Sequence, residues 1–211
     1  MIRIVTVERE YGCGGGEIAK RLAELLGWKL WDHLLTEEIA RLANCSKAVV
    51  EQREERTDPL YYRLFKSFLR GSYEGSINAH KLNLVDSENI LKMTERVVLH
   101  AAGKGDSVIV GRGSQLLLSS RPDTFRVFLY ASREDKVRRL LSRGKSEKDA
   151  QELVDTVDRE RAGFIEKYFH VAWPDRAVYH VMINTAVGDE TVVHTIVNFI
   201  KSFDSKSNTP A

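Results

Sequence analysis

The sequence predicts a three-layer α/β/α protein built around a five-stranded parallel sheet. Short apolar runs alternate along the chain with segments of helical periodicity. The runs are mainly apolar, which is typical of strands that are buried on both faces of a parallel sheet. A cluster of glycines at residues 12–16 separates the first apolar run from the first helical segment. Together these three observations favour an open α/β sheet with a ligand loop after its first strand.

The first part of the chain predicts a β-α-β unit. Residues 2–7 are an apolar run typical of a buried strand, and residues 17–26 have the spacing of an amphipathic helix that ends at Gly27. Residues 28–31 predict a second short strand, and residues 34–43 predict a second helix.

Residues 46–90 depart from this alternation, and we interpret them as a helical insertion. A polar stretch over 46–58 precedes a group of aromatic side chains at helical spacing. These side chains suit stacking on a nucleobase, a small core, or a subunit contact that would make the protein a homodimer. The aromatic residues are Tyr61, Tyr62, Phe65, Phe68 and Tyr73.

The second half of the chain predicts the rest of the sheet and its covering helices. Strands are expected at residues 107–110, 125–130 and 179–183, and helices at 90–102 and 190–203.

A strongly charged helical pair lies between the last two strands, over residues 133–170. The first helix ends near Gly144, and the second begins with a capping pattern of Ser146 and Asp149. The whole pattern fits one domain over residues 1–204 followed by a flexible tail.

The composition narrows the class of protein. The 211 residues include 43% hydrophobic side chains, which is enough for one full core. A formal charge of +2 gives no overall field for nucleic acid or for a membrane surface, and no apolar run approaches the roughly 20 residues that span a bilayer. The two cysteines, Cys13 and Cys45, make no disulfide framework, and the chain opens directly into a strand. We therefore expect a cytoplasmic protein.

The glycine cluster predicts an anion site. A strand that turns on glycines into a helix points backbone amides and the positive end of the helix dipole at one place. In the usual loop, G-x-x-x-x-G-K-[ST], only Gly14 would match, whereas Arg9, Gly15 and Gly16 replace the first glycine, the lysine and the hydroxyl residue. The positive charge for the phosphates and the metal-binding hydroxyl must then come from another part of the chain, or be absent.

Several motifs resemble the nucleoside monophosphate kinases, and among them the cytidylate kinases. Residues 107–113 resemble the strand that ends in Gly-Arg-Asp in that family, residues 125–140 its lid entry, and residues 158–161 its lid exit. More narrowly, Arg-Glu-Tyr-Gly-Cys-Gly-Gly at residues 9–15 is similar to the loop of the cytidylate kinase-like family. The resemblance covers most of the chain outside residues 46–90.

The resemblance implies a P-loop kinase-like fold with an arginine-rich lid, and transfer of the γ-phosphoryl group of ATP to a nucleoside monophosphate such as CMP, with Mg²⁺ on the donor phosphates. Two positions depart from the family pattern. Gly16 stands where an arginine is expected, and Gly113 stands where cytidylate kinases have the aspartate of Gly-Arg-Asp. The acceptor base is therefore left open.

We expect the donor nucleotide to be held by the loop and its neighbours. Glu17 could ligate magnesium, or pair with Arg21 one helical turn later. Cys13 could have a depressed thiol pKa and act as a redox brake, or be a small residue at a variable position. Arg9 could restore a cation to the loop, or pair with a neighbouring glutamate. The predicted donor-binding residues are Arg9, Gly12, Cys13, Gly14, Gly15, Gly16, Glu17 and Arg143.

The resemblance assigns catalysis to three lid arginines, Arg139, Arg159 and Arg161, which would stabilise charge on the transferred phosphoryl group. The other cations of the first lid helix are predicted to be solvated; they are Arg133, Lys136 and Arg138.

Two residues after strands are predicted to bind the acceptor. Arg112 follows the 107–110 strand and Asp32 follows the second strand, at the edge where open α/β sheets bind ligands. A structural salt bridge is the alternative for Arg112, and a helix N-cap is the alternative for Asp32. The histidines have no metal-ligand spacing, so we expect no resident metal site.

Two other functions remain open at this point. A nucleotide-binding regulator could have kept the loop and lost catalysis, since the lysine and the hydroxyl are both absent. A kinase of another small metabolite would fit Gly113 and the aromatic insertion. Nucleic-acid binding through the basic helix ranks last, because the overall charge is balanced, and we expect no nucleic-acid partner.

Overall fold

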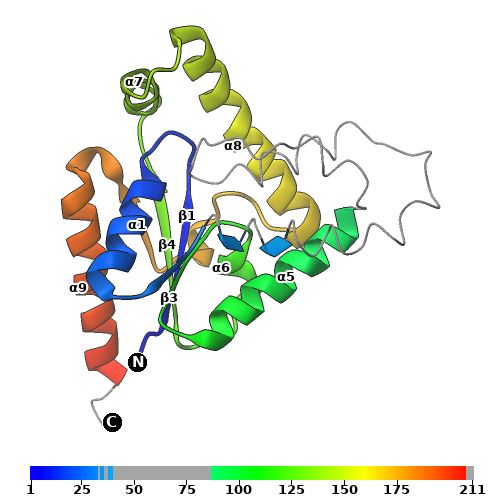
Figure 1. Cartoon of the computed structure of the whole chain (residues 1–211), viewed down its shortest axis with the longest axis vertical. Helices are drawn as coiled ribbons and strands as arrows, with labels where there is room; N and C mark the ends of the chain where they lie inside the picture. Colours follow the sequence, from blue (N-terminus) through cyan, green and yellow to red (C-terminus); the bar gives the residue numbers. More distant parts are fainter. Residues whose placement is uncertain (33, 36–37, 40–86, 208–211) are drawn as a thin grey trace.

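The computed structural model describes residues 1–32, 34–35, 38–39 and 87–207. Five parallel strands form one sheet in the order β2-β3-β1-β4-β5. Helices cover both faces of the sheet, as Figure 1 shows. The predicted three-layer architecture is confirmed.

The two strands at the centre of the fold, β1 and β3, are buried along their whole length. β1 (Ile4–Arg9) lies between β3 (Ser107–Val110) and β4 (Thr124–Tyr130), and every residue of β1 and β3 is buried. β2 (Lys29–Trp31) and β5 (Val181–Asn184) form the two outer strands. Because all five strands are parallel, the residues that follow them gather at one edge, which we call the carboxyl edge.

One face of the sheet is covered by α1 (Gly15–Leu26) and α9 (Asp189–Ser207) (Figure 1). The apolar stripe of α1, which includes Ile18 and Leu22, packs into the larger core with residues of β1, β3, β4 and α9. The helix ends at Gly27, whose φ of +67° is a conformation that glycine adopts without strain. The helix predicted over 17–26 is thus confirmed, with its start two residues earlier.

The other face is covered by α5 (Ser87–Lys104) and the single-turn helix α6 (Ser114–Leu117). A second core forms here, in which Val98 of α5 packs with Ile4 and Ile109 of the sheet. The short α6 was not predicted, because one turn of helix has too few residues to show a periodic pattern.

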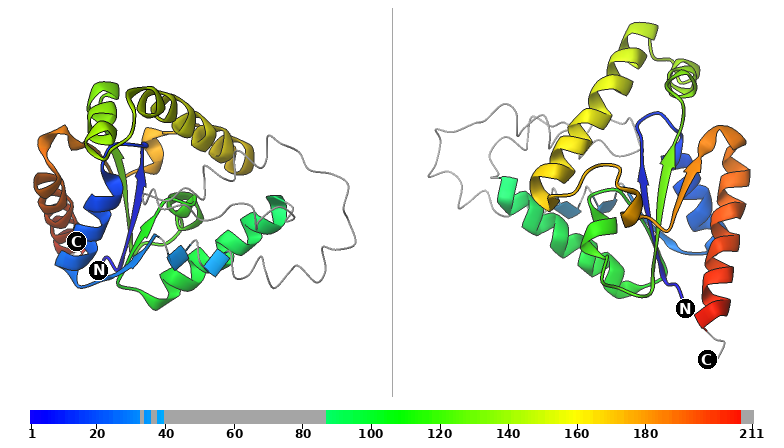
Figure 2. Two further views of the ribbon diagram at one scale, coloured as in Figure 1. Left: turned by 45° about the horizontal axis from the view of Figure 1, so that its top comes forward. Right: turned by 180° about the vertical axis from the view of Figure 1, so that it is seen from behind.

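The charged helical pair forms a lid that extends past the carboxyl edge (Figures 1 and 2). It consists of α7 (Arg133–Ser142) and α8 (Glu147–Phe169). Each helix begins at a serine whose hydroxyl accepts a hydrogen bond from a backbone amide at 3.1 Å, Ser132 in α7 and Ser146 in α8. The predicted cap at Ser146 is confirmed.

Several further boundaries differ from the prediction. β1 spans residues 4–9 where 2–7 was predicted, and α5 spans 87–104 where 90–102 was predicted. β5 begins two residues later than the predicted start at 179, because the 3-10 turn η2 (Arg176–Val178) precedes it. Residues 205–207, predicted to belong to a flexible tail, continue α9. The carboxylate of Asp204 accepts a hydrogen bond from the amide of Ile2 at 2.6 Å, which fixes this end of α9 to the start of the chain. A second 3-10 turn, η3 (Thr185–Val187), connects β5 to α9.

Part of the predicted insertion lies outside the described residues. α5 begins at Ser87, inside the predicted limits of 46–90, and the aromatic residues at 61–73 are not among those described. Residues 34–35 and 38–39 are helical as predicted. Within the described part of the chain, no helix combines the length and apolarity needed to cross a membrane.

Candidate phosphate-binding site at the carboxyl edge

The glycine loop, residues 10–14, connects β1 to α1 at the carboxyl edge. Gly12 and Gly14 have φ angles of +80° and +86°, which side chains rarely adopt. The first intrahelical bond of α1 runs from the amide of Ile18 to the carbonyl of Gly14, at 3.2 Å. The amides that precede Ile18 therefore lie outside the helical ladder, at the positive end of the helix dipole. This arrangement is suited to an anion.

Two of the glycines are required by arginines packed against them. A Cβ at Gly15 would lie 2.8 Å from Cβ of Arg9, which is closer than real Cβ contacts. A Cβ at Gly14 would overlap the guanidinium of Arg139. The loop thus gains a close approach to two arginines in place of the lysine that it lacks.

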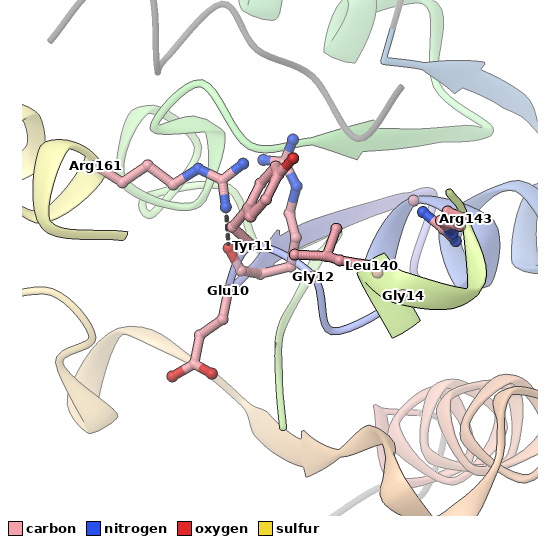
Figure 3. Close-up of a pocket in the computed structure, with 10 residues that line it drawn as sticks. Glu10, Tyr11, Gly12, Gly14, Leu140, Arg143 and Arg161 are labelled. Carbon is pink, nitrogen blue, oxygen red and sulfur yellow. Dashed lines mark hydrogen bonds between the residues drawn. The ribbon is translucent and has the colours of Figure 1, made fainter. Parts of the chain in front are cut away.

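A pocket opens at the loop, with Arg143 at the end of α7 and Arg161 on α8 among its lining residues (Figure 3). The chain therefore brings together loop residues and lid arginines that are more than a hundred positions apart. The complete lining is Arg9, Glu10, Tyr11, Gly12, Gly14, Gly15, Gly16, Leu140, Arg143 and Arg161.

Arg161 is held in place by the loop itself. Its Nη1 donates a hydrogen bond to the carbonyl of Arg9 at 2.9 Å, drawn as a dashed line in Figure 3. The residue is 6% exposed. Burial and the nearby charge of Arg9 lower the pKa of Arg161. A buried guanidinium under this repulsion favours the approach of an anion.

Arg112 and Arg9 add two more buried guanidinium groups at the same edge, 2% and 3% exposed. Burial and the charge of Arg9 lower the pKa of Arg112 to about 9, and the carboxylate of Asp32 acts in the opposite direction. Asp32 is itself buried. The two predicted acceptor residues thus lie within electrostatic reach of each other, and Arg112 also faces the charge of Arg161.

Arg139 lies on the other flank of the loop. Its guanidinium donates to the carboxylate of Asp189, at 3.0 Å from both Nη1 and Nη2, and to the carbonyl of Thr185 at 3.2 Å. Arg139 is therefore fixed between Gly14 and the start of α9, next to the pocket without lining it.

The third predicted catalytic arginine, Arg159, is exposed on α8 and does not line the pocket. It lies two residues from Arg161, and positions two apart on a helix point in nearly opposite directions. Of the cations predicted to be solvated, Arg133 pairs with Asp155 and Arg138 pairs with Asp135 at the surface, as expected.

Three alternatives left open by the sequence are decided by local contacts. Nη1 of Arg9 lies 3.5 Å from the carboxylate of the buried Glu8, so Arg9 pairs with a neighbouring glutamate. The carboxylate of Glu17 lies 3.3 Å from Nε of Arg21, so the i,i+4 pair forms. Burial raises the pKa of the Cys13 thiol to about 11, and the charge of Glu10 adds to the effect. The hypothesis of a depressed thiol pKa is therefore wrong, because Cys13 is enclosed in the core next to the carbonyl of Leu129.

Lys136 of α7 was predicted to be solvated, and this is wrong. It is 8% exposed, and its ammonium lies 2.8 Å from the carboxylate of Glu10 and 3.0 Å from that of Asp158. The sequence carries one signal for its burial, since Lys136 lies one helical turn before the buried Leu140 and shares its face.

No group of three or more His, Cys, Asp or Glu side chains among the described residues is arranged to hold a metal ion.

Solved structures share this fold. An uncharacterized protein from Eubacterium ventriosum is 25% identical, with a TM-score of 0.68, and the match covers 96% of this chain and 99% of that one. A shikimate kinase from Bacteroides thetaiotaomicron is 14% identical, with a TM-score of 0.52 and coverage of 95% and 99%. A shikimate kinase from Acinetobacter baumannii, in complex with shikimate, is 17% identical, with a TM-score of 0.53 and coverage of 96% and 94%. The likeness to the two shikimate kinases shows that this chain has the same fold as they do.

No curated protein matches this chain. A family model described as the cytidylate kinase-like family matches residues 4–187. This span contains the glycine loop, both lid helices and every strand of the described sheet. The chain therefore belongs to the cytidylate kinase-like family.

Proposed function

We propose that this protein is a cytoplasmic phosphotransferase that moves the γ-phosphoryl group of ATP to a small acceptor, with a nucleoside monophosphate such as CMP as the first candidate. The proposal is carried by the three buried guanidinium groups at the carboxyl edge, Arg9, Arg112 and Arg161. Their mutual repulsion and their burial disfavour the charged state of Arg112 and Arg161. A bound phosphate would relieve this cost, as expected of a site prepared for anions.

The donor triphosphate would be held from three sides. The amides at the start of α1 would bind its oxygens, and Arg161 would supply a guanidinium from α8. Arg143 reaches the same pocket from α7, and Arg139 flanks it beside Gly14. In this arrangement arginines provide the charge that a loop lysine supplies elsewhere.

Magnesium fits this site as an ion carried by the donor. The nearest first-turn carboxylate, Glu17, is already paired with Arg21, which argues against direct ligation by Glu17. Magnesium commonly keeps several waters and binds through substrate phosphates, where it neutralises developing charge. The chain's own part is then to orient the phosphates and to shield them from water.

The acceptor would lie near Arg112 and Asp32.

A kinase of a metabolite that is not a nucleotide is a second candidate, favoured by one contact. Gly113 has a φ of +66°, and a Cβ there would lie 2.7 Å from the ring of Phe169. An aromatic ring therefore occupies the space where cytidylate kinases carry an aspartate side chain.

An acceptor panel tests the proposal. The protein is incubated with Mg²⁺ and ATP together with CMP, other nucleoside monophosphates and small hydroxylated acids, and ADP release is measured beside ATP affinity. Acceptor-dependent ADP release with CMP is expected. Release with a metabolite alone would favour the second candidate. ATP binding without turnover on any acceptor would identify a regulator and contradict the proposal.

A further inference from the structure

An ion cluster joins the glycine loop to both lid helices. It consists of Glu10 in the loop, Lys136 on α7 and Asp158 on α8, with the Lys136 ammonium between the two carboxylates at 2.8 Å and 3.0 Å. The hydrogen bonds and charges of these carboxylates raise the pKa of Lys136, although burial acts against the charged form. The contacts are therefore strong enough to keep a buried ammonium charged.

Each member of the ion cluster also contacts the backbone of a neighbouring segment. The carboxylate of Asp158 accepts a hydrogen bond from the amide of Tyr11 at 2.7 Å. The carboxylate of Glu10 accepts one from the amide of Ala131 at 3.3 Å, just before α7. Gly12 packs on Lys136 itself, since a Cβ at Gly12 would lie 3.2 Å from Cβ of Lys136. The base of the lid is thus docked on the loop.

Apolar contacts complete this junction. The ring of Tyr11 lies in a small core between the two lid helices, where it packs with Leu140 of α7 and with Ala150, Val154 and Val157 of α8. Loop and lid therefore form one unit at this point.

The ion cluster also adjoins the proposed phosphate site. Glu10 lines the pocket, and the carboxylate of Asp158 lies 3.5 Å from Nη1 of Arg161. With Lys136 present, these four side chains carry no net charge. Without Lys136, they would carry one negative charge beside the triphosphate, and the carboxylate of Asp158 would compete with it for Arg161.

We propose that Lys136 is a positioning residue that neutralises Glu10 and Asp158 and docks the loop on the lid, so that the loop and Arg161 accept a triphosphate. This role rests on the proposed function. Lys136 does not line the pocket, so it acts through the residues that do.

Charge-matched variants test this role. Affinity for MgATP is measured by calorimetry for the wild type, Lys136→Met and Lys136→Met/Asp158→Asn. The asparagine keeps an oxygen that can accept from the Tyr11 amide. We expect Lys136→Met to bind at least tenfold more weakly, and the double variant, in which the charges of Glu10 and Arg161 balance, to regain most of that loss.

Unchanged affinity in Lys136→Met would overturn the inference, as would a folded double variant that binds no better than Lys136→Met. If Lys136→Met does not fold, affinity of the double variant more than tenfold below that of the wild type would contradict the inference.

Amide hydrogen exchange in the ligand-free protein separates this inference from the proposed function. Exchange at Tyr11 is expected to be at least tenfold faster in Lys136→Met, because the acceptor Asp158 loses its partner. Faster exchange in a protein whose wild type binds no MgATP would refute the proposed function and leave the docking intact. Unchanged exchange would refute the docking.

Discussion

The two edges of the sheet hold their arginines in opposite ways. At the carboxyl edge, Arg9, Arg112 and Arg161 are almost completely buried. At the other edge, where the strands begin, Arg3 pairs with Asp106 and Arg121 pairs with Asp123, and the two arginine side chains are 51% and 36% exposed. The same residue type is thus solvated at one edge and enclosed at the other.

If the proposed function holds, this difference marks where the protein gives up stability for binding. Exposed ion pairs contribute about 0–1 kcal/mol, and they require little of the fold. Arg9 and Arg161 each have a carboxylate at 3.5 Å, from Glu8 and Asp158, but three guanidinium groups enclosed at one edge are still costly to bury, and such clusters persist where an anion is to be bound. The exposed edge is therefore the natural control for every substitution at the carboxyl edge.

The largest difference in affinity for MgATP is expected between Arg161→Met and Arg121→Met. Arg161 would donate charge-assisted hydrogen bonds to the triphosphate, each of about 1.5–3 kcal/mol, so its loss should weaken MgATP binding roughly 100-fold. Arg121→Met should bind as the wild type does. Calorimetric titration measures both, and equal affinities in the two variants would contradict the assignment of Arg161.

A smaller contrast concerns two glycines with the same backbone conformation. Gly113 follows β3 at the carboxyl edge and lies under the ring of Phe169, whereas Gly27 precedes β2 with nothing within 4 Å, at φ angles of +66° and +67°. Alanine at either site should cost about 1–2 kcal/mol for the left-handed backbone. Gly113→Ala should cost about 1–3 kcal/mol more, because the new Cβ meets the ring.

Urea unfolding of the two variants measures this difference directly. The excess should shrink when Phe169 is also replaced by alanine. Equal losses of unfolding free energy in Gly113→Ala and Gly27→Ala would show that the Phe169 ring does not restrict the space next to Gly113.

The fold was predictable because its signals are local. Mainly apolar runs such as 107–110 predict buried parallel strands, and the glycines at 12–16 predict the loop. The site was predictable only in part, because exposure depends on packing between distant segments. Arg159 and Arg161 are the same residue type in the same predicted helix, so the motif does not distinguish them. Only Arg161 shares a helix face with the buried Val154 and Val157.

Lys136 is a second side chain whose exposure was not predicted correctly, because its burial depends on distant segments. A cation in a helix rich in charge predicts solvent exposure, and nothing local to α7 shows that Glu10 and Asp158 approach from other elements. The ring of Phe169 over Gly113 is a second contact between distant segments. Sequence patterns find the elements, whereas such contacts arise only when the elements pack.

Within the carboxyl edge, Arg112→Met should separate acceptor from donor. Arg112 follows β3 beside Asp32 and does not line the loop pocket, so its loss should raise the KM of the acceptor about tenfold. The affinity for MgATP should change by less than about threefold, since Arg161 and the loop remain. Steady-state kinetics with each substrate varied in turn tests this, and an equal loss for the donor would place Arg112 in the triphosphate site.

The smallest effect is expected at the exposed edge. Arg3→Met removes the pair with Asp106, and the free energy of unfolding should change by less than about 1 kcal/mol. Urea unfolding measures the change. A larger loss of unfolding free energy would mean that the ion pairs at the exposed edge also stabilise the fold. The contrast between the two edges would then be weaker.

The central claim is that main-chain amides and buried arginines hold a triphosphate without a loop lysine. A crystal structure with Mg²⁺ and a non-hydrolysable ATP analogue tests it most directly. The account predicts phosphate oxygens within hydrogen-bond distance of the amides of Gly14–Gly16 and of the guanidinium of Arg161. A triphosphate bound elsewhere, with the turn after β1 left empty, would contradict it.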